Sequence, residues 1–122
     1  MTRDWEIIRA ILIRLEDSNT PNSVVNMNEF DGVDGQAVAY HMRLLRDVDC
    51  IEANIRETST GDNLIGAAIA RRLTSKGHDL LDTIRNESIW NQVKSKFQSK
   101  GIDMTIDMVI SVGNRLMQSM LS

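Results

Sequence analysis

Apolar residues near the start of the chain recur every three or four positions, the spacing of one helix face. The pattern covers residues 4–17 and predicts an amphipathic first helix. Residues 24–30 begin with β-branched side chains and partly alternate, which predicts a brief strand. A turn over 31–35 follows, and Asp34 is a suitable N-cap for a second helix over 35–47. The chain is therefore predicted to begin with a helix, a strand and a helix.

The middle of the chain has the pattern of a β-hairpin that leads into a capped helix. Residues 50–56 predict a strand, the polar, glycine-bearing residues 58–63 predict a hairpin tip, and residues 64–73 contain the returning strand. Thr74 can cap an amphipathic helix over 75–85. A helix, a hairpin and a capped helix in this order are typical of the second half of a winged-helix domain.

Two further helices are predicted after a break at residues 86–87. The apolar face of the first, which ends at Gly101, consists of Ile89, Trp90, Val93 and Phe97. Asp103 or Thr105 can cap the second, whose apolar face consists of Ile106, Val109, Ile110, Gly113, Met117 and Met120. This second face either packs back on the N-terminal helix over residues 4–17 or forms a dimer seam, in which Gly113 would allow close helix approach.

These elements predict an α+β fold that is mainly α. We expect a winged helix-turn-helix core over residues 1–85 and a two-helix C-terminal extension over 86–122, which packs on the domain or dimerises. Cys50 is the only cysteine of the 122 residues, so no internal disulfide can form and a reducing cytoplasm is expected. The apolar runs are far shorter than the roughly 20 residues that span a bilayer. The acidic N-terminal segment does not resemble a secretory signal, so no membrane association is expected.

The helix over 35–47 has two distinct sides when its residues are placed at the helical period. The apolar side carries Ala37, Val38, His41, Leu44, Leu45 and Val48. The opposite side carries Gln36, Ala39, Tyr40, Arg43, Arg46 and Asp47. A histidine at the centre of the apolar side is predicted to be a hydrogen-bonded core residue rather than a catalytic base or a metal ligand.

The polar side of this helix is the best candidate for contact with nucleic acid. Gln36, Tyr40, Arg43 and Arg46 suit base edges or phosphates. Arg56, Arg71 and Arg72 flank the hairpin and could bind backbone phosphates. The alternatives are a solvated helix surface, with Asp47 close by, and strand arginines that keep an exposed sheet edge soluble.

Charge gives little support to strong DNA binding. The formal net charge is −3, and residues 33–77 carry six basic and six acidic side chains. Non-specific affinity for DNA comes from neutralised phosphates. We therefore expect weak DNA binding unless the basic residues are segregated on one face or the protein dimerises.

No other motif predicts catalysis or a cofactor. His78 and Asp82 have a spacing that suits metal ligation, but two ligands do not make a site. Cys50 is predicted to be a small core residue, since no base is evidently directed at it. The chain has no phosphate loop, nucleophile elbow or cysteine cluster. We expect no enzyme activity, no metal and no cofactor.

Three parts of the chain form a recognisable pattern: Leu73-Thr74-Ser75-Lys76-Gly77-His78, Trp90 and the upstream Val38-Ala39-Tyr40-His41. Together they resemble an uncharacterised phage and prophage family, domain of unknown function 2513. The resemblance implies a small protein of phage or mobile-element origin with a winged-helix core, and no particular activity. Many relatives have Ala-Gly where this chain has Val48-Asp49, which adds an acid beside the proposed DNA face.

Two hypotheses follow. In the first, the protein is a DNA-binding winged-helix protein of phage or prophage origin, a small transcriptional regulator that acts on double-stranded DNA as a homodimer through its C-terminal helices. In the second, it is a phage-encoded interaction module or inhibitor of a host protein, with the winged helix only a scaffold. Acidic net charge and the apolar C-terminal helices motivate the second.

Overall fold

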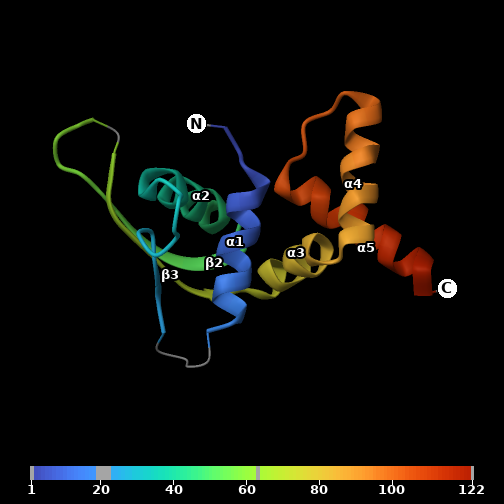
Figure 1. Ribbon diagram of the computed structural model, residues 1–122, viewed down its shortest axis with the longest axis horizontal. Coiled ribbons are helices and arrows are strands. Elements are labelled where there is room, and N and C mark those ends of the chain that lie inside the picture. Colours follow the sequence, from blue (N-terminus) through green and yellow to red (C-terminus); the bar gives the residue numbers. More distant parts are fainter. Residues whose placement is uncertain (1, 19–22, 63, 122) are drawn as a thin grey trace. The chain divides into compact units, whose positions relative to one another are not determined.

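The computed structural model describes residues 2–18, 23–62 and 64–121. Its elements in chain order are α1 (Trp5–Glu16), β1 (Val25–Asn26), α2 (Gly35–Asp47), β2 (Ile51–Glu57), β3 (Ile65–Leu73), α3 (Ser75–Arg85), α4 (Glu87–Lys100) and α5 (Ile106–Leu121) (Figure 1). The predicted α+β class, mainly helical, is confirmed. No helix in the described ranges is both long enough and apolar enough to cross a membrane.

The chain divides into two compact units, residues 1–77 and 78–122. The sequence had suggested a division after residue 85, at the break between α3 and α4. The observed division falls inside α3 instead. The reason lies at each end of that helix: Gly77 packs on the backbone of the first unit, whereas Thr83 packs on α5 in the second.

The sheet of the first unit has the strand order β1-β3-β2 among the described residues, with antiparallel pairing throughout. β2 and β3 form a long curved ribbon, drawn green to yellow in Figure 1. The strand predicted over 24–30 is only two residues long. Asn26 ends it, because its side chain accepts from the N–H of Asn28 and its carbonyl from the N–H of Glu29, which turns the chain.

Helices α1 and α2 pack on each other and on this sheet. Their buried side chains form the core together with the inner face of β3. The fully buried members are Ile8, Ile11, Leu12, Val38, Ala39, Met42, Leu45, Ala68 and Ala70. Ala39 was predicted on the outward side of its helix, and that prediction is wrong. α2 contacts both a helix and a sheet, so it buries a wider arc than a single apolar stripe.

His41 is the buried histidine that its position in the sequence predicts, with an exposed fraction of 1%. Its Nδ1 lies 2.7 Å from the carbonyl oxygen of Ala37, and its Nε2 accepts from the backbone N–H of Asp4 at 2.8 Å. The ring therefore ties α2 to the N-terminus of α1, where the Asp4 side chain caps the helix. Both ring nitrogens serve the fold, which confirms the interpretation as a satisfied core residue.

Asp49 follows α2 in the left-handed region, with φ of +64°. Its N–H donates to the carbonyl of Arg46, and the N–H of Cys50 donates to the carbonyl of Leu45. This pair of bonds is a Schellman motif, in which glycine is the usual residue at the left-handed position. The acid therefore stands where the backbone favours glycine.

We expect Asp49→Gly to stabilise the protein by about 0.5–1 kcal/mol, because glycine adopts this conformation without the steric cost of a Cβ. The melting temperature should rise by a few degrees. Asp49→Ala is the matched control. It removes the same carboxylate but keeps the Cβ, and should lower the melting temperature. Equal effects of the two substitutions would show that charge, and not backbone conformation, decides stability at this position.

The junction between β3 and α3 explains the Leu-Thr-x-x-Gly pattern of residues 73–77. Leu73 is buried at the end of β3. The Thr74 hydroxyl accepts from the N–H of Gly77 at 3.1 Å, as predicted for an N-cap, and donates to the carbonyl of Asp49. A Cβ on Gly77 would lie 2.0 Å from the carbonyl oxygen of Cys50. The motif thus fastens the start of α3 to the turn between α2 and β2.

In the second unit, α4 begins and ends at recognisable caps, and α5 begins at one. Asn86 caps α4, and the helix ends at Gly101, as predicted, with that glycine in the left-handed conformation. Of the two residues considered for α5, Thr105 is the one whose hydroxyl accepts from an N–H of the first turn, that of Met108. Gly113 of α5 is buried against Thr83 of α3. The close helix approach that was predicted for a dimer seam at Gly113 is therefore made within one chain.

Candidate nucleic-acid interface

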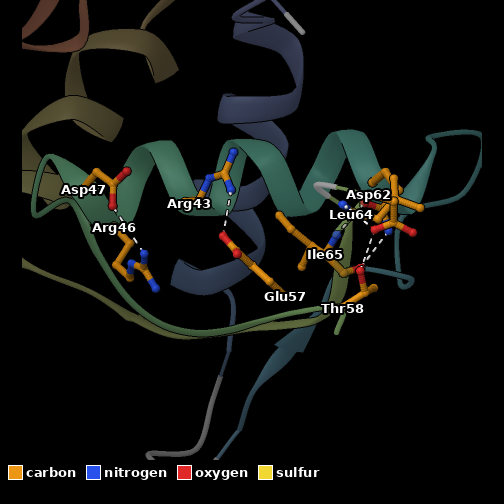
Figure 2. A network of polar contacts seen from close by, with 9 residues as sticks. Arg43, Arg46, Asp47, Glu57, Thr58, Asp62, Leu64 and Ile65 are labelled. Carbon is orange, nitrogen blue, oxygen red and sulfur yellow. Dashed lines mark hydrogen bonds and ion pairs between the residues drawn. The ribbon is translucent and has the colours of Figure 1, made fainter. Parts of the chain in front are cut away.

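Arg43 and Arg46 lie on the exposed side of α2, with about a third of each side chain accessible (33% and 39%). An Nη of Arg43 is 3.5 Å from a carboxylate oxygen of Glu57 on β2, and its guanidinium lies 5.8 Å from the centre of the Tyr40 ring. Arg46 is 3.4 Å from the carboxylate of Asp47. Figure 2 shows Glu57 reaching from the hairpin toward Arg43. The helix and the hairpin therefore meet along this side of the first unit.

Gln36 has a structural task that the sequence did not indicate. Its amide nitrogen donates to the carbonyl of Ile65 at 2.7 Å, and its amide oxygen accepts from the N–H of the same residue at 2.9 Å. The Gln36 amide thus pairs with both backbone polar groups of Ile65, as a neighbouring strand would. Because both ends of the amide are occupied, we leave Gln36 out of the proposed interface.

Two hairpin arginines are held by neighbouring side chains of the same sheet. Arg72 donates two hydrogen bonds of 2.7 Å to Glu52, which lies directly opposite it in the sheet register. The hydrogen bond from Arg72 lowers the pKa of Glu52, and the same contact raises the pKa of Arg72. Arg71 donates to the amide oxygen of Asn54 at 2.8 Å. Arg56 is exposed and has no polar partner among the described residues.

An aspartate side chain holds the tip of the hairpin in place through hydrogen bonds. The Asp62 carboxylate accepts from the hydroxyl of Thr58 and, at 3.0 Å, from the N–H of Leu64 (Figure 2). The bond from Thr58 is the largest cause of a lowered pKa at Asp62. The ribbon consequently ends in a fixed negative charge, an unfavourable neighbour for a phosphate.

The first unit as a whole is acidic. Residues 1–77 carry nine arginine and lysine residues against twelve aspartate and glutamate residues. Around the candidate interface, Arg43, Arg46 and Arg72 each lie beside an acid. The surface is therefore of mixed charge, and the arginines are positioned by acids that a phosphate would have to replace.

The remaining candidates for chemistry do not assemble into a site. Cys50 is fully buried, as expected for a core residue, and His78 and Asp82 are exposed on α3. The described part of the chain contains no group of three or more histidine, cysteine, aspartate or glutamate residues that could hold a metal ion.

A family model described as "Hypothetical protein (DUF2513)" matches residues 2–103, which include every element except α5. The chain belongs to this family. It is also 37% identical over 122 residues to an uncharacterized protein of Haemophilus influenzae, with 100% of both chains covered. No solved structure matches the chain. The resemblance found in the sequence is confirmed at the level of the DUF2513 family, and phage origin stays a prediction.

Proposed function

We propose that the first unit binds double-stranded DNA as a winged-helix module of a small, phage-type transcriptional regulator. The observation that carries this proposal is the contact between Arg43 of α2 and Glu57 of β2, since it joins an arginine-bearing helix and an arginine-bearing hairpin into one surface. The strand order β1-β3-β2, with the helix immediately before β2, supports a winged-helix arrangement. Residues 27–34, where a winged helix usually has a further helix, form turns.

In this proposal the helix contributes Tyr40, Arg43 and Arg46 to the groove, and the hairpin contributes Arg56 and Arg71 to the phosphates. Arg56 is the first choice for a phosphate contact, because it has no competing partner in the described ranges. Arg72 is the last choice, because its two short bonds to Glu52 hold it in the sheet. The ion pair of Arg43 is long and exposed, so exchanging it for a phosphate costs little.

We expect specific binding to fragments from the gene's own neighbourhood at low salt, with few phosphates neutralised. Fluorescence anisotropy should show that Arg43→Ala combined with Arg46→Ala raises Kd about a hundredfold, at roughly tenfold per lost contact. Glu57→Gln should change Kd in the opposite direction. It frees Arg43 and removes an acid from the DNA face, so binding should tighten a few-fold.

Arg14→Ala is the matched control for the arginine substitutions. Arg14 is also exposed, pairs with Glu29 and lies over the ring of Phe30, but it belongs to α1. Its loss should leave Kd unchanged, and all variants should keep the melting temperature of the wild-type protein within a few degrees. Failure of the wild-type protein to bind DNA at low salt, or tighter binding by the double alanine variant, would refute the proposal.

The mixed charge of this face favours a second candidate function, binding to a host protein with the winged helix as scaffold. Protein interfaces tolerate alternating acids and bases that DNA does not. Under this alternative the wild-type protein fails to bind DNA, and Glu57→Gln weakens a purified complex instead of strengthening one. Deletion of residues 103–122 is a poor test, because it would uncover the side of Thr83 on which Gly113 packs.

A further inference from the structure

An apolar hollow of about 350 Å³ lies within the second unit, between the end of α4 and residues 108–116 of α5. Phe97, Ile102, Met108, Val112 and Leu116 provide its apolar surface. Ile102 and Met108 are 47% and 38% exposed, so they leave apolar surface open to water at the hollow. Met108 and Leu116 are separated by about 12 Å along the helix, at 1.5 Å per residue. The hollow is therefore elongated and open to water.

The rim of this hollow is cationic. Lys96 and Lys100 of α4 and Arg115 of α5 line it. None of the three has an ion-pair partner among the described residues, in contrast to Arg43, Arg46 and Arg72 of the first unit. Among the residues that the structure describes, no acidic side chain lines the hollow. Three unpaired cations around an apolar floor are complementary to a ligand that has an apolar body and an anionic end.

The size of the hollow favours a small ligand over a protein partner. Its volume is within the range of about 300–1,000 Å³ that is typical of small-molecule pockets, and clefts between packed helices are common places for them. A stable protein–protein interface involves about 20–30 residues on each side. Eight lining residues are too few for such an interface.

We propose that the α4–α5 hollow binds an anionic amphiphile with a single medium-length alkyl chain, whose anionic head is either a carboxylate, as in a fatty acid, or a phosphate monoester. The chain would lie along Met108, Val112 and Leu116, and the headgroup would be held by Lys100 and Arg115. This site belongs to the second unit and does not depend on DNA binding by the first. Loss of either function therefore leaves the other measurable.

The full-length protein can be titrated with decanoate below its micellar concentration and followed by calorimetry and by the methyl signal of Met108. We expect saturable binding of one molecule per chain. Lys100→Glu combined with Arg115→Glu should weaken binding at least about tenfold, because charge-assisted bonds to the headgroup are lost. Val112→Trp fills the hollow and should abolish binding. Decyl phosphate should bind as decanoate does if any anionic headgroup suffices, and more weakly if a carboxylate is required.

Lys94→Glu is the matched control. It changes the same charge on the same helix, but Lys94 lies over the ring of Trp90 and does not line the hollow. Its affinity for decanoate should stay within about twofold of the wild-type value. Equal binding of decyltrimethylammonium, the absence of saturable decanoate binding, or binding that survives Val112→Trp would overturn the proposal. So would binding of a glutamate- and leucine-rich peptide without binding of decanoate, which would assign the hollow to a protein segment.

Discussion

Gly77→Ala is expected to destabilise the first unit by about 3 kcal/mol or more, a large effect for one methyl group. The added Cβ would lie 2.0 Å from the carbonyl oxygen of Cys50 and 3.0 Å from its carbonyl carbon. That oxygen is fixed, because it accepts from the N–H of Thr74 at 3.0 Å. The obstacle is backbone, so no rotamer change can relieve the clash. Urea unfolding should show a lowered midpoint with an unchanged slope.

Ser75→Ala provides the control for this prediction. Ser75 lies in the same first turn of α3 but is exposed, so its replacement should change the free energy of unfolding by less than about 0.5 kcal/mol. A Gly77→Ala protein as stable as the wild type would mean that the start of α3 can move away from Cys50. The Leu-Thr-x-x-Gly pattern would then need a role other than this close approach.

Gly113→Ala is expected to destabilise the second unit by about 1–3 kcal/mol, for a related but different reason. Here the added Cβ would lie 2.4 Å from both the hydroxyl oxygen and the methyl group of Thr83. The Thr83 side chain is fully buried and its hydroxyl donates to the carbonyl of Asp79, so it cannot simply rotate away. Thermal unfolding of the full-length protein should report the loss.

Because this obstacle is a side chain, a second substitution should partly relieve it. Thr83→Ala removes the two nearest atoms and leaves the Thr83 Cβ, 2.9 Å away. The double variant should therefore be more stable than the two single effects predict, with a coupling energy of about 1 kcal/mol. Asn114→Ala, at the exposed next position of α5, is the control. Additive effects of Gly113→Ala and Thr83→Ala would show that these two residues do not contact each other.

The two glycines bear on what the family pattern means. Residues 73–77, with the pattern Leu-Thr-x-x-Gly, carry part of the resemblance to the family. In this chain the contacts of these residues are structural, since Thr74 caps α3 and Gly77 permits contact with the backbone of Cys50. Membership of the DUF2513 family thus supports a shared fold more directly than a shared ligand. The proposed DNA binding depends instead on the arginines of α2 and the hairpin.

Much of the fold could be predicted from the sequence because its signals are local. α2 spans the predicted residues 35–47 and α3 the predicted residues 75–85. Periodic apolar residues, the caps Asp34 and Thr74, and the glycine at position 101 act over one turn of chain. The burial of His41 followed from its place at the centre of an apolar stripe.

The candidate site was less predictable, because it depends on register. The pairing of β2 with β3 shifts twice, between Glu52 and Ala53 and between Arg56 and Glu57. Counting residues outward from the hairpin tip therefore does not place Glu52 opposite Arg72. The sequence supplied the arginines of the interface, but not the acids that hold them.

Local spacing along the chain thus determined where helices and strands begin and end, since caps and amphipathic periods are set by neighbours a few residues away. Only the tertiary structure decided which partner each polar side chain meets. The Gln36 amide is hydrogen-bonded to the backbone of Ile65, Ala39 is buried, and Gly113 packs against the Thr83 side chain. The two contacts join residues about 30 positions apart, and Ala39 lies at the boundary of its helix face. Packing of whole elements, rather than the preference of any residue, fixes them.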